Sequence, residues 1–222
     1  TLLAGINTYG VSYDTNRLGG SVAPLNDIFD PIYDATVTLN SNNTGFKNSG
    51  SQIGVYFQDQ MKIYDKLILV LGGRYDWADA YNNSYRNQAT LDALGIERKQ
   101  NRSDSAFTGR VGLLYLFDNG LAPYASFSQS FDPTALNAGV SADGTQFEPS
   151  KADQYEVGLR YQPAGENFLI SGAIYRIDQD HVLMTDPENN LFSIQTGKVR
   201  SQGIELEARA SIGNLNLVAA YS

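Results

Sequence analysis

The sequence predicts an all-β protein, an antiparallel up-and-down β-barrel that crosses a membrane. Three observations predict it: apolar and polar residues alternate over long stretches, these stretches are longer than ordinary strands, and short and long connections alternate between them. Successive side chains of a strand point to opposite faces, so each alternating stretch has one apolar and one polar face. A membrane-spanning strand needs roughly 9–11 residues, whereas strands of globular proteins usually have about five or six.

Nine stretches fit this pattern, and most of them are long enough to cross the hydrocarbon layer. In chain order they are Leu2–Tyr13, Gln52–Tyr64, Leu67–Ala78, Ser105–Phe117, Leu121–Phe131, Ala152–Gln162, Phe168–Asp178, Val199–Ile212 and Leu215–Ser222. Helical periodicity is absent, and a single helical turn at Leu91–Ile96 is the only helix we expect.

The first three strands share one pattern. Leu2–Tyr13 opens on an apolar segment, and Leu67–Trp77 separates apolar from polar residues cleanly. In Ile53–Tyr64 one face is apolar from Ile53 onward, except for Asp59. A β-bulge at that point would redirect the carboxylate away from the apolar face.

The middle strands alternate in the same way. Between Ser105–Phe117 and Leu121–Phe131, the segment Asp118-Asn119-Gly120 is a hairpin signal, because it contains a residue suited to positive φ. In Tyr155–Tyr161, tyrosine, valine and leucine share one face, and glutamate, glycine and arginine the other.

The last three strands differ in clarity. Phe168–Asp178 is ambiguous, because neither of its faces is uniformly apolar or polar. Gly203–Ile212 has an apolar even-numbered face and a polar odd-numbered face, and Leu215–Tyr221 repeats the split.

The connections between the strands are alternately short and long. The short ones are Asp65-Lys66, Asp118–Gly120, Pro163–Asn167 and Gly213-Asn214, and the long ones are Thr15–Gly50, Asp79–Asp104, Asp132–Ser150 and about Gln179–Arg200. In an up-and-down meander, this rhythm places all short turns at one end and all long loops at the other. Aromatic residues gather near the strand ends, as in the interfacial girdle of a membrane barrel: Tyr64, Tyr75, Trp77, Tyr115, Phe117, Phe131, Tyr161 and Tyr175.

Composition excludes several classes of protein. The 222-residue chain has no cysteine, so a disulfide framework, a thiolate metal site and a cysteine nucleophile are excluded. Its formal net charge of −8 argues against nucleic acid as a partner. The longest apolar run, Leu67–Gly73, is far too short for a transmembrane helix. No signal peptide precedes the first strand, and both ends lie within the strand pattern, so we expect an internal fragment of a longer chain.

Two acidic motifs could carry chemistry, and a structural interpretation is favoured for both. Glu205 and Glu207 share a face at a spacing compatible with general acid–base catalysis, but as lumen charges they would pair with Arg160 or Arg209. Asp178-Gln179-Asp180-His181 could present metal ligands, but a strand leaving the membrane explains it better. We therefore expect no catalytic residue, no metal site and no enzyme activity.

The long loops carry interspersed aromatic residues among polar ones. Loops on a rigid scaffold often bind ligands, and aromatic rings beside hydrogen-bonding groups suit a compact polar ligand with some apolar surface. The predicted substrate-binding residues are Phe29, Tyr33, Phe46, Tyr81, Tyr85, Phe147 and Phe192. For any single one of them, packing within the loops is the competing interpretation. A soluble β-sandwich also alternates, so a β-rich adhesin or a carbohydrate-binding module stays open as a different class.

Several strings, in this order, resemble one family over nearly the whole chain. They are Gly54–Gln60, Leu71–Trp77, Tyr124–Phe131, Phe147–Lys151 leading into Tyr155–Gly158, Thr185–Pro187 and Gln195–Glu207. The set resembles the barrel of TonB-dependent siderophore receptors, and most closely the ferrichrome (ferric hydroxamate) branch. The loop segment Asn16–Gly20 lacks the aromatic residues that this branch tends to have there.

The resemblance implies a fold and a function. It implies that residues 1–222 are a partial barrel domain, about nine strands of a 22-strand barrel, with the N-terminal plug domain absent. It implies a bacterial outer-membrane receptor that binds a ferric siderophore, its transported ligand, and imports it by TonB-energised transport, with no covalently bound cofactor. The implied partners are the siderophore, outer-membrane lipid and lipopolysaccharide, and TonB through the missing N-terminal region. A glycan or cobalamin as cargo of the same architecture is the alternative.

Overall fold

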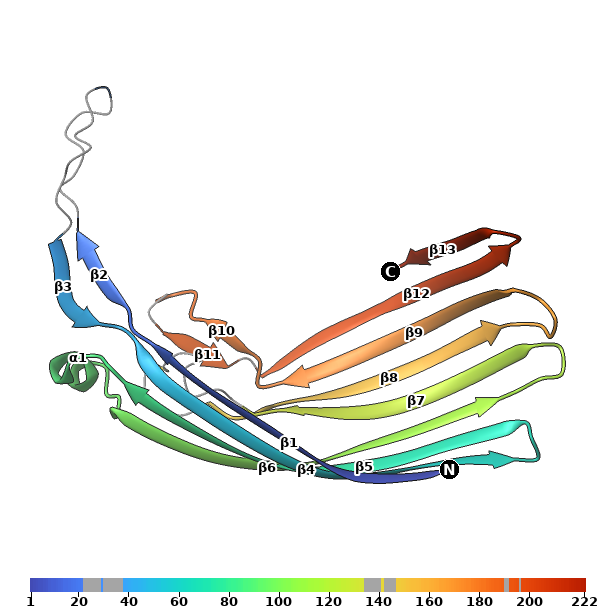
Figure 1. Ribbon diagram of the computed structural model, residues 1–222, viewed down its shortest axis with the longest axis horizontal. Helices are drawn as coiled ribbons and strands as arrows, with labels where there is room; N and C mark the ends of the chain where they lie inside the picture. Colours follow the sequence, from blue (N-terminus) through green and yellow to red (C-terminus); the bar gives the residue numbers. More distant parts are fainter. Residues whose placement is uncertain (22–28, 30–37, 134–140, 142–146, 190–191, 196) are drawn as a thin grey trace.

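The computed structural model describes residues 1–21, 29, 38–133, 141, 147–189, 192–195 and 197–222. Nine strands form one antiparallel sheet, with each strand beside its neighbour in the meander (Figure 1). In sheet order they are β1 Leu2–Thr15, β4 Phe46–Ile63, β5 Leu67–Ser84, β6 Lys99–Tyr115, β7 Leu121–Asp132, β8 Ser150–Tyr161, β9 Phe168–Asp180, β12 Lys198–Ile212 and β13 Leu215–Tyr221. The predicted meander of nine strands is confirmed.

Short turns and long loops lie at opposite ends of the sheet, as the sequence predicts (Figure 1). Two of the long loops carry small hairpins, which alternation did not predict: β2 Leu18–Ser21 with β3 Thr38–Asn43, and β10 Leu183–Thr185 with β11 Ser193–Gln195. A third contains the helix α1, Gln88–Ala93. Within the described residues, the only helical segment is too short to cross a membrane.

Helix α1 begins earlier than the predicted turn at Leu91–Ile96. Asn87 caps it, because its side chain accepts a hydrogen bond of 2.8 Å from the amide of Thr90. Leu91 is completely buried. The cap sets where the helix starts, and the burial of Leu91 anchors it in the loop.

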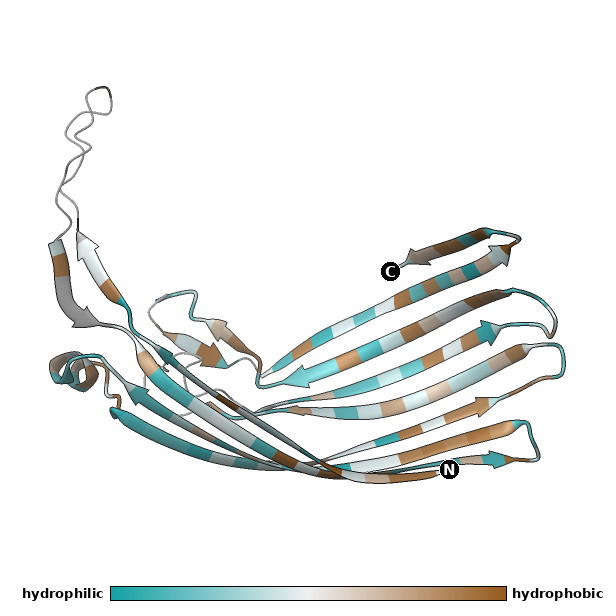
Figure 2. Cartoon of the chain, viewed as in Figure 1, coloured by the Kyte–Doolittle hydropathy of each residue, from teal (hydrophilic) through white to brown (hydrophobic). Residues whose placement is uncertain are grey.

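Three strands, β4, β5 and β6, extend farthest beyond their predicted bounds at the long-loop end. Backbone pairing continues to Phe46 opposite Ser84 and to Asn83 opposite Lys99. Both faces are largely polar there, so alternation gives no signal although the pairing persists. Figure 2 shows the same gradient, with hydrophobic colour concentrated toward the short-turn halves of the strands.

The two faces of the curved sheet differ in crowding. Most of the buried residues of the sheet belong to one face: Asn48, Asp76, Ala78, Asn82, Ala106 and Ala122. We call this the concave face, because side chains converge on the inside of a curved sheet. The opposite, convex face exposes large apolar side chains, including Ile53, Val55, Phe57, Trp77, Phe107, Val111 and Leu113.

Aromatic belts border the apolar band of the convex face. Toward the long-loop end, the ring centroids of Tyr75 and Trp77 are 4.7 Å apart, and those of Phe127 and Tyr155 are 5.0 Å apart. Toward the short-turn end, Tyr115 and Phe117 form a pair at 4.7 Å and Tyr161 and Phe168 one at 5.8 Å. This arrangement is typical of interfacial girdles. One predicted member is wrong: Tyr175 lies on the concave face, opposite Gly203, because register rather than nearness to a strand end decides the face.

Asp59 remains on the convex face. Register is continuous across β1, β4 and β5 at this point, with Asp59 opposite Leu2 and Leu71. The bulge suggested by the sequence is absent, because every residue of β4 has a partner in β5 and no extra residue is inserted.

The turn between β6 and β7 depends on Gly120, which has a φ of +86°. A Cβ atom there would lie 2.5 Å from the carbonyl oxygen of Gln162. We expect Gly120→Ala to lower the free energy of unfolding by about 1–3 kcal/mol, because both strain and a backbone clash oppose it. Gly10→Ala is the matched control, since nothing lies within 4 Å of its Cβ position. Chemical denaturation of both variants tests this, and equal stability would contradict it.

Candidate functional site

A carboxylate on β5 organises the concave face. Asp76, only 3% exposed, accepts a hydrogen bond of 2.8 Å from Gln52 Nε2 and one of 2.6 Å from Arg74 Nε. Arg74 Nη2 also donates to Asn7 Oδ1 at 2.5 Å, which joins β5 to β1 across β4. A side chain at Gly54 would overlap the guanidinium of Arg74. The glycine therefore gives Arg74 room to lie flat on the concave face of the sheet. Arg74 and Asp76, which alternate along β5, are thus linked by hydrogen bonds to β4 and β1.

A second polar cluster lies on β7 and β8. The phenol of Tyr124 donates a hydrogen bond of 2.6 Å to Glu156 Oε1, and the guanidinium of Arg160 lies 5.3 Å from the centre of the Tyr124 ring. The ring rests over Gly158 as Arg74 rests over Gly54. Glu205 and Glu207 line a hollow of about 430 Å³ beside this cluster.

The acidic pair on β12 has an ionic partner. Arg209 Nε donates to Glu207 Oε1, and both residues belong to the concave face by register. This is the pairing that the structural interpretation of the sequence predicted. A carboxylate held by a guanidinium is a poor general acid.

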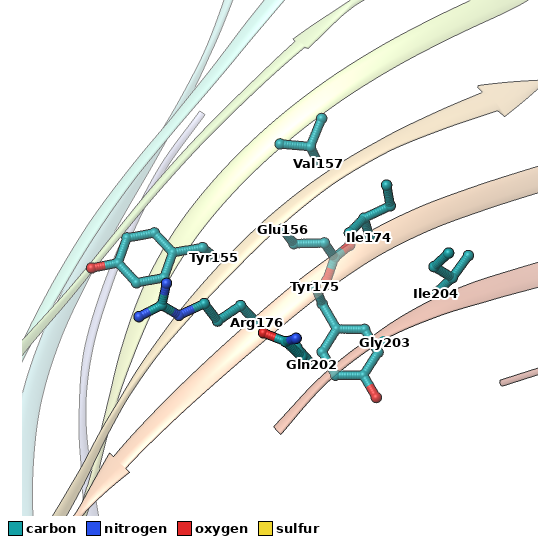
Figure 3. A pocket seen from close by; sticks show the side chains of 9 residues that line it. All are labelled: Tyr155, Glu156, Val157, Ile174, Tyr175, Arg176, Gln202, Gly203 and Ile204. Atoms are coloured by element: carbon teal, nitrogen blue, oxygen red, sulfur yellow. The ribbon is translucent and has the colours of Figure 1, made fainter. Parts of the chain in front are cut away.

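The Asp178–His181 segment is occupied by ion pairs rather than assembled as a metal site. Asp178 lies between Arg176 and Arg200, and Arg176 faces the convex side between Tyr155 and Gln202 (Figure 3). Over the described residues, no group of three or more His, Cys, Asp or Glu side chains is placed to hold a metal ion. His181 Nε2 lies 3.2 Å from Glu148 Oε2.

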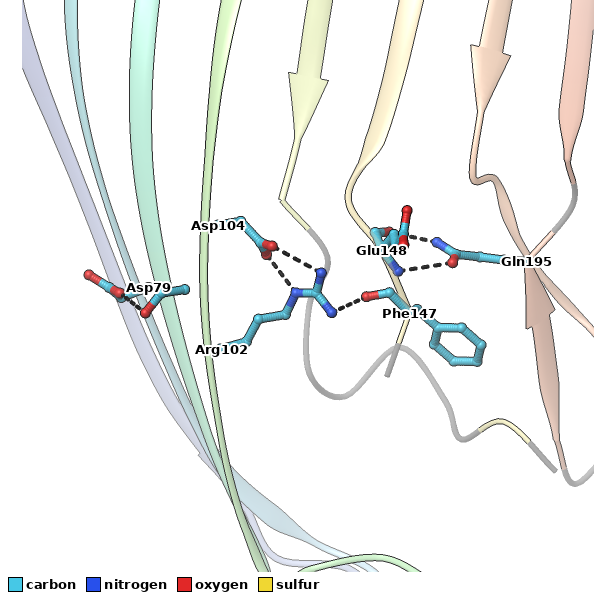
Figure 4. A network of polar contacts seen from close by, with 7 residues as sticks. Asp79, Arg102, Asp104, Phe147, Glu148 and Gln195 are labelled. Carbon is cyan, nitrogen blue, oxygen red and sulfur yellow. Dashed lines mark hydrogen bonds and ion pairs between the residues drawn. The ribbon is translucent and has the colours of Figure 1, made fainter. Parts of the chain in front are cut away.

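Strand and loop segments from distant parts of the chain meet at the long-loop end (Figure 4). Arg102 binds Asp104 at 2.7 and 2.9 Å and also donates to the carbonyl of Phe147. Gln195 and the backbone of Glu148 exchange two hydrogen bonds, of 2.6 and 2.9 Å. Sequence reasoning missed this network. The same-face spacing of Arg102 and Asp104 was a signal, but no pattern links them to Phe147.

The predicted ligand-binding aromatics are spread over the long-loop end. Phe46 lies on the concave face of β4 and forms an edge contact with Tyr13 at 5.8 Å. Tyr81 lies on the convex face of β5, opposite Ser49 and Asn101.

The other predicted aromatics lie in the loops. Phe147 is buried, whereas Phe29 is almost fully exposed. Phe192 closes the turn before β11, and Tyr85 follows β5. Tyr33 lies outside the described residues. Burial of Phe147 favours the packing role that competes with ligand binding for that residue.

Tyr85 makes a charged contact that a titration can detect. Its phenol donates a hydrogen bond of 2.7 Å to Asp14 Oδ2, and this bond raises the pKa of Tyr85 above the usual 10.0. The stabilisation from the bond is fully present below pH 10 and is lost as the pH rises through the higher pKa of the folded state. We expect Asp14→Asn to bring the phenol pKa back toward 10.0, measured by ultraviolet difference titration. An unchanged titration curve would contradict the contact.

The sequence comparison identifies one family. The family model described as "TonB dependent receptor-like, beta-barrel" matches residues 1–222. The chain is 38% identical to the ferrichrome outer membrane transporter/phage receptor of Escherichia coli (strain K12), over 100% of this chain and 29% of that protein. It is 37% identical to the ferrioxamine B receptor of Salmonella typhimurium (strain SL1344), over 100% of this chain and 30% of that protein. The chain therefore spans less than a third of the length of these relatives.

Solved structures share the fold. The siderophore receptor PiuA from Acinetobacter baumannii superposes with a TM-score of 0.71 at 16% identity, over 99% of this chain and 35% of that one. The ferric yersiniabactin uptake receptor FyuA from Yersinia pestis gives a TM-score of 0.67 at 14% identity, over 99% of this chain and 32% of that one. At such low identity, these two likenesses concern the fold alone.

Proposed function

The chain belongs to the TonB-dependent receptor-like β-barrel family, and on that premise we propose that it is part of the barrel of a bacterial outer-membrane receptor that binds and imports a ferric siderophore. The related proteins named above are receptors and transporters, and the proposed role includes no catalysed chemical step. We further propose that residues 1–222 are a partial barrel domain. In this proposal, the plug domain and the contact with TonB belong to regions outside this chain.

One observation carries the proposal from the structure itself. The sheet separates an apolar convex face, bordered by aromatic belts, from a concave face with networks around Asp76 and Glu156. A soluble sandwich turns its apolar faces inward onto a second layer, but no second layer covers the convex face among the described residues. In the proposed barrel, lipid covers the convex face and water fills the lumen beside the concave one.

The proposed cargo is a ferric hydroxamate. Two relatives that align with the whole chain are named for ferrichrome and ferrioxamine B, and both compounds are hydroxamates. A ferric catecholate, cobalamin or a glycan as cargo would be bound by the same barrel architecture through different loop contacts. Among the predicted aromatics, Phe46 is favoured for these contacts because its strand position faces the lumen. Tyr81 is not proposed as a contact, because it lies on the convex face.

Phe46 and Tyr81 form a matched pair for testing the ligand site. In the intact receptor, we expect Phe46→Ala to weaken ferrichrome or ferrioxamine B binding about fivefold, since an aromatic contact contributes roughly 1 kcal/mol. Tyr81→Ala removes an aromatic from the convex face at the same end and leaves affinity unchanged. Isothermal titration calorimetry measures both, and uptake of radioactive iron with and without TonB tests transport.

Three outcomes would count against parts of the proposal. Absence of binding by any ferric hydroxamate would overturn the cargo. A Tyr81→Ala loss equal to that of Phe46→Ala would overturn the assignment of the ligand to the concave face. Uptake that persists without TonB would overturn the mode of transport.

A further inference from the structure

A row of hydrogen-bonding side chains crosses the concave face of β4 to β7. Strand register places four residues side by side in this row: Gln58, Gly72, Arg110 and Ser128. Gly72 contributes no side chain, and a Cβ atom there would lie 3.0 Å from both Cγ and Nε of Arg110. The stem of Arg110 therefore lies across Gly72, close to the backbone of the sheet.

Arg110 differs from the other cations of the concave face. Those cations are engaged by a carboxylate or an aromatic ring: Arg74 by Asp76, Arg102 by Asp104, Arg209 by Glu207, Lys62 by Asp65, and Arg160 by the ring of Tyr124. The side chain of Arg110 is exposed, and it forms no ion pair or hydrogen bond with another residue that the structure describes. Its N–H donors therefore face the space in front of the concave face.

A positively charged hollow of about 350 Å³ lies beside Arg110. Its lining includes these residues of the concave face: Tyr56, Gln58, Arg74, Thr108, Arg110 and Ser128. Among the described residues, no aspartate or glutamate lines it, whereas three glutamates line the hollow of about 430 Å³ beside β12. Because Asp76 neutralises Arg74, the charge of this hollow comes from Arg110.

The hollow is separate from the ligand contact proposed at Phe46. Gln58, in the row of Arg110, follows Phe46 by twelve residues along β4, which corresponds to about 40 Å of strand. Both positions face the concave side. A solute that leaves Phe46 and moves along this face toward the short-turn end therefore meets the row of Arg110.

We propose that Arg110 is a specificity-determining residue of the lumen, which favours passage of a neutral ferric hydroxamate over one that carries a free ammonium group. Hydroxamate oxygens bound to iron carry negative charge, and a guanidinium donates hydrogen bonds to such oxygens in a fixed planar geometry. An ammonium group is repelled by the same guanidinium, since no carboxylate neutralises it. The inference rests on the proposed function and deepens it: ferrichrome is a neutral complex, whereas ferrioxamine B has a free ammonium group.

Uptake of radioactive iron by the intact receptor tests Arg110. The probes are ferrichrome and ferrioxamine B, and the uptake rate at saturating concentration is measured separately from the equilibrium affinity. We expect R110Q to lower the saturating rate for ferrichrome about tenfold, because charge-assisted hydrogen bonds are lost, and not to lower the rate for ferrioxamine B. Affinity for either compound should change by less than about twofold, since Phe46 is distant.

A charge-reversed variant and a control on the opposite face complete the design. R110E places a carboxylate beside the hollow, so the receptor should import ferrioxamine B faster than ferrichrome. Lys99→Gln removes a cation from the convex face of the same strand and should leave both rates unchanged. Denaturant unfolding of each variant verifies that it is folded.

The outcomes separate this inference from the proposed function. Failure of the unaltered receptor to import either compound would overturn the proposed function. Import of both compounds at rates that R110Q and R110E leave unchanged would overturn the role of Arg110 alone. An equal loss for both compounds would also overturn that role and would indicate a contact with the plug domain, which faster hydrogen exchange of the plug in cargo-free R110Q would identify.

Discussion

Replacing Val111 with arginine should lower the free energy of unfolding of the membrane-inserted receptor by about 2–4 kcal/mol. Val111 lies in the middle of the convex side of β6, between Leu71 and Phe127 on the neighbouring strands. If lipid covers this side, the new guanidinium must enter hydrocarbon or distort the bilayer to reach water. Denaturant unfolding from lipid vesicles measures the loss.

The same substitution on the other face is the control. Ser126 is on the concave side of β7, opposite Gly112 and Glu156, so the guanidinium of Ser126→Arg would lie in the lumen near a carboxylate. We expect its effect to stay within about 1 kcal/mol. A larger loss for Ser126→Arg than for Val111→Arg would mean that the assignment of the two faces is inverted.

Replacing Asp76 with alanine should cost about 3 kcal/mol, because it leaves Arg74 and Gln52 without their common acceptor in a crowded site. Asp76→Asn keeps an oxygen for Gln52 and should cost less. The measurement is a denaturant transition for each single variant and for the double variant Arg74→Ala/Asp76→Ala.

The double variant separates the ion pair from general packing. Once Asp76 is gone, further removal of Arg74 should have little additional effect. The free energy lost in the double variant should therefore be smaller than the sum of the two single losses by about 1 kcal/mol or more. Strict additivity would show that the contact between Arg74 and Asp76 contributes no stability of its own.

Much of the fold could be predicted from alternation because each strand has one apolar face. Where both faces are polar, as near Phe46 and Ser84, the backbone pairing continues without a pattern in the sequence. In β9 the pattern is obscured for a different reason, since Arg176 and Asp178 share a face with Ile174. The prediction of Tyr175 as a girdle residue is wrong, because nearness to a strand end does not determine on which face of the sheet a side chain lies.

The candidate site is less predictable from the sequence than the sheet that supports it. Loop aromatics could be identified by composition, but their placement depends on contacts between distant segments. Arg102 holds the carbonyl of Phe147 from 45 residues away, and Gln195 holds the backbone of Glu148 from 47. Such contacts leave no periodic pattern in the sequence, so only the three-dimensional structure shows them.

The glycines under large concave side chains have a consequence for the width of the passage. Arg74 rests over Gly54, Tyr124 over Gly158 and Tyr175 over Gly203, so these bulky groups lie flat instead of projecting inward. A methyl group at such a position would lift the ring or guanidinium toward the central axis. In the proposed barrel, such glycines would thereby help to set the width of the lumen available to a solute, and a substitution there would narrow the lumen without altering any residue that contacts the solute.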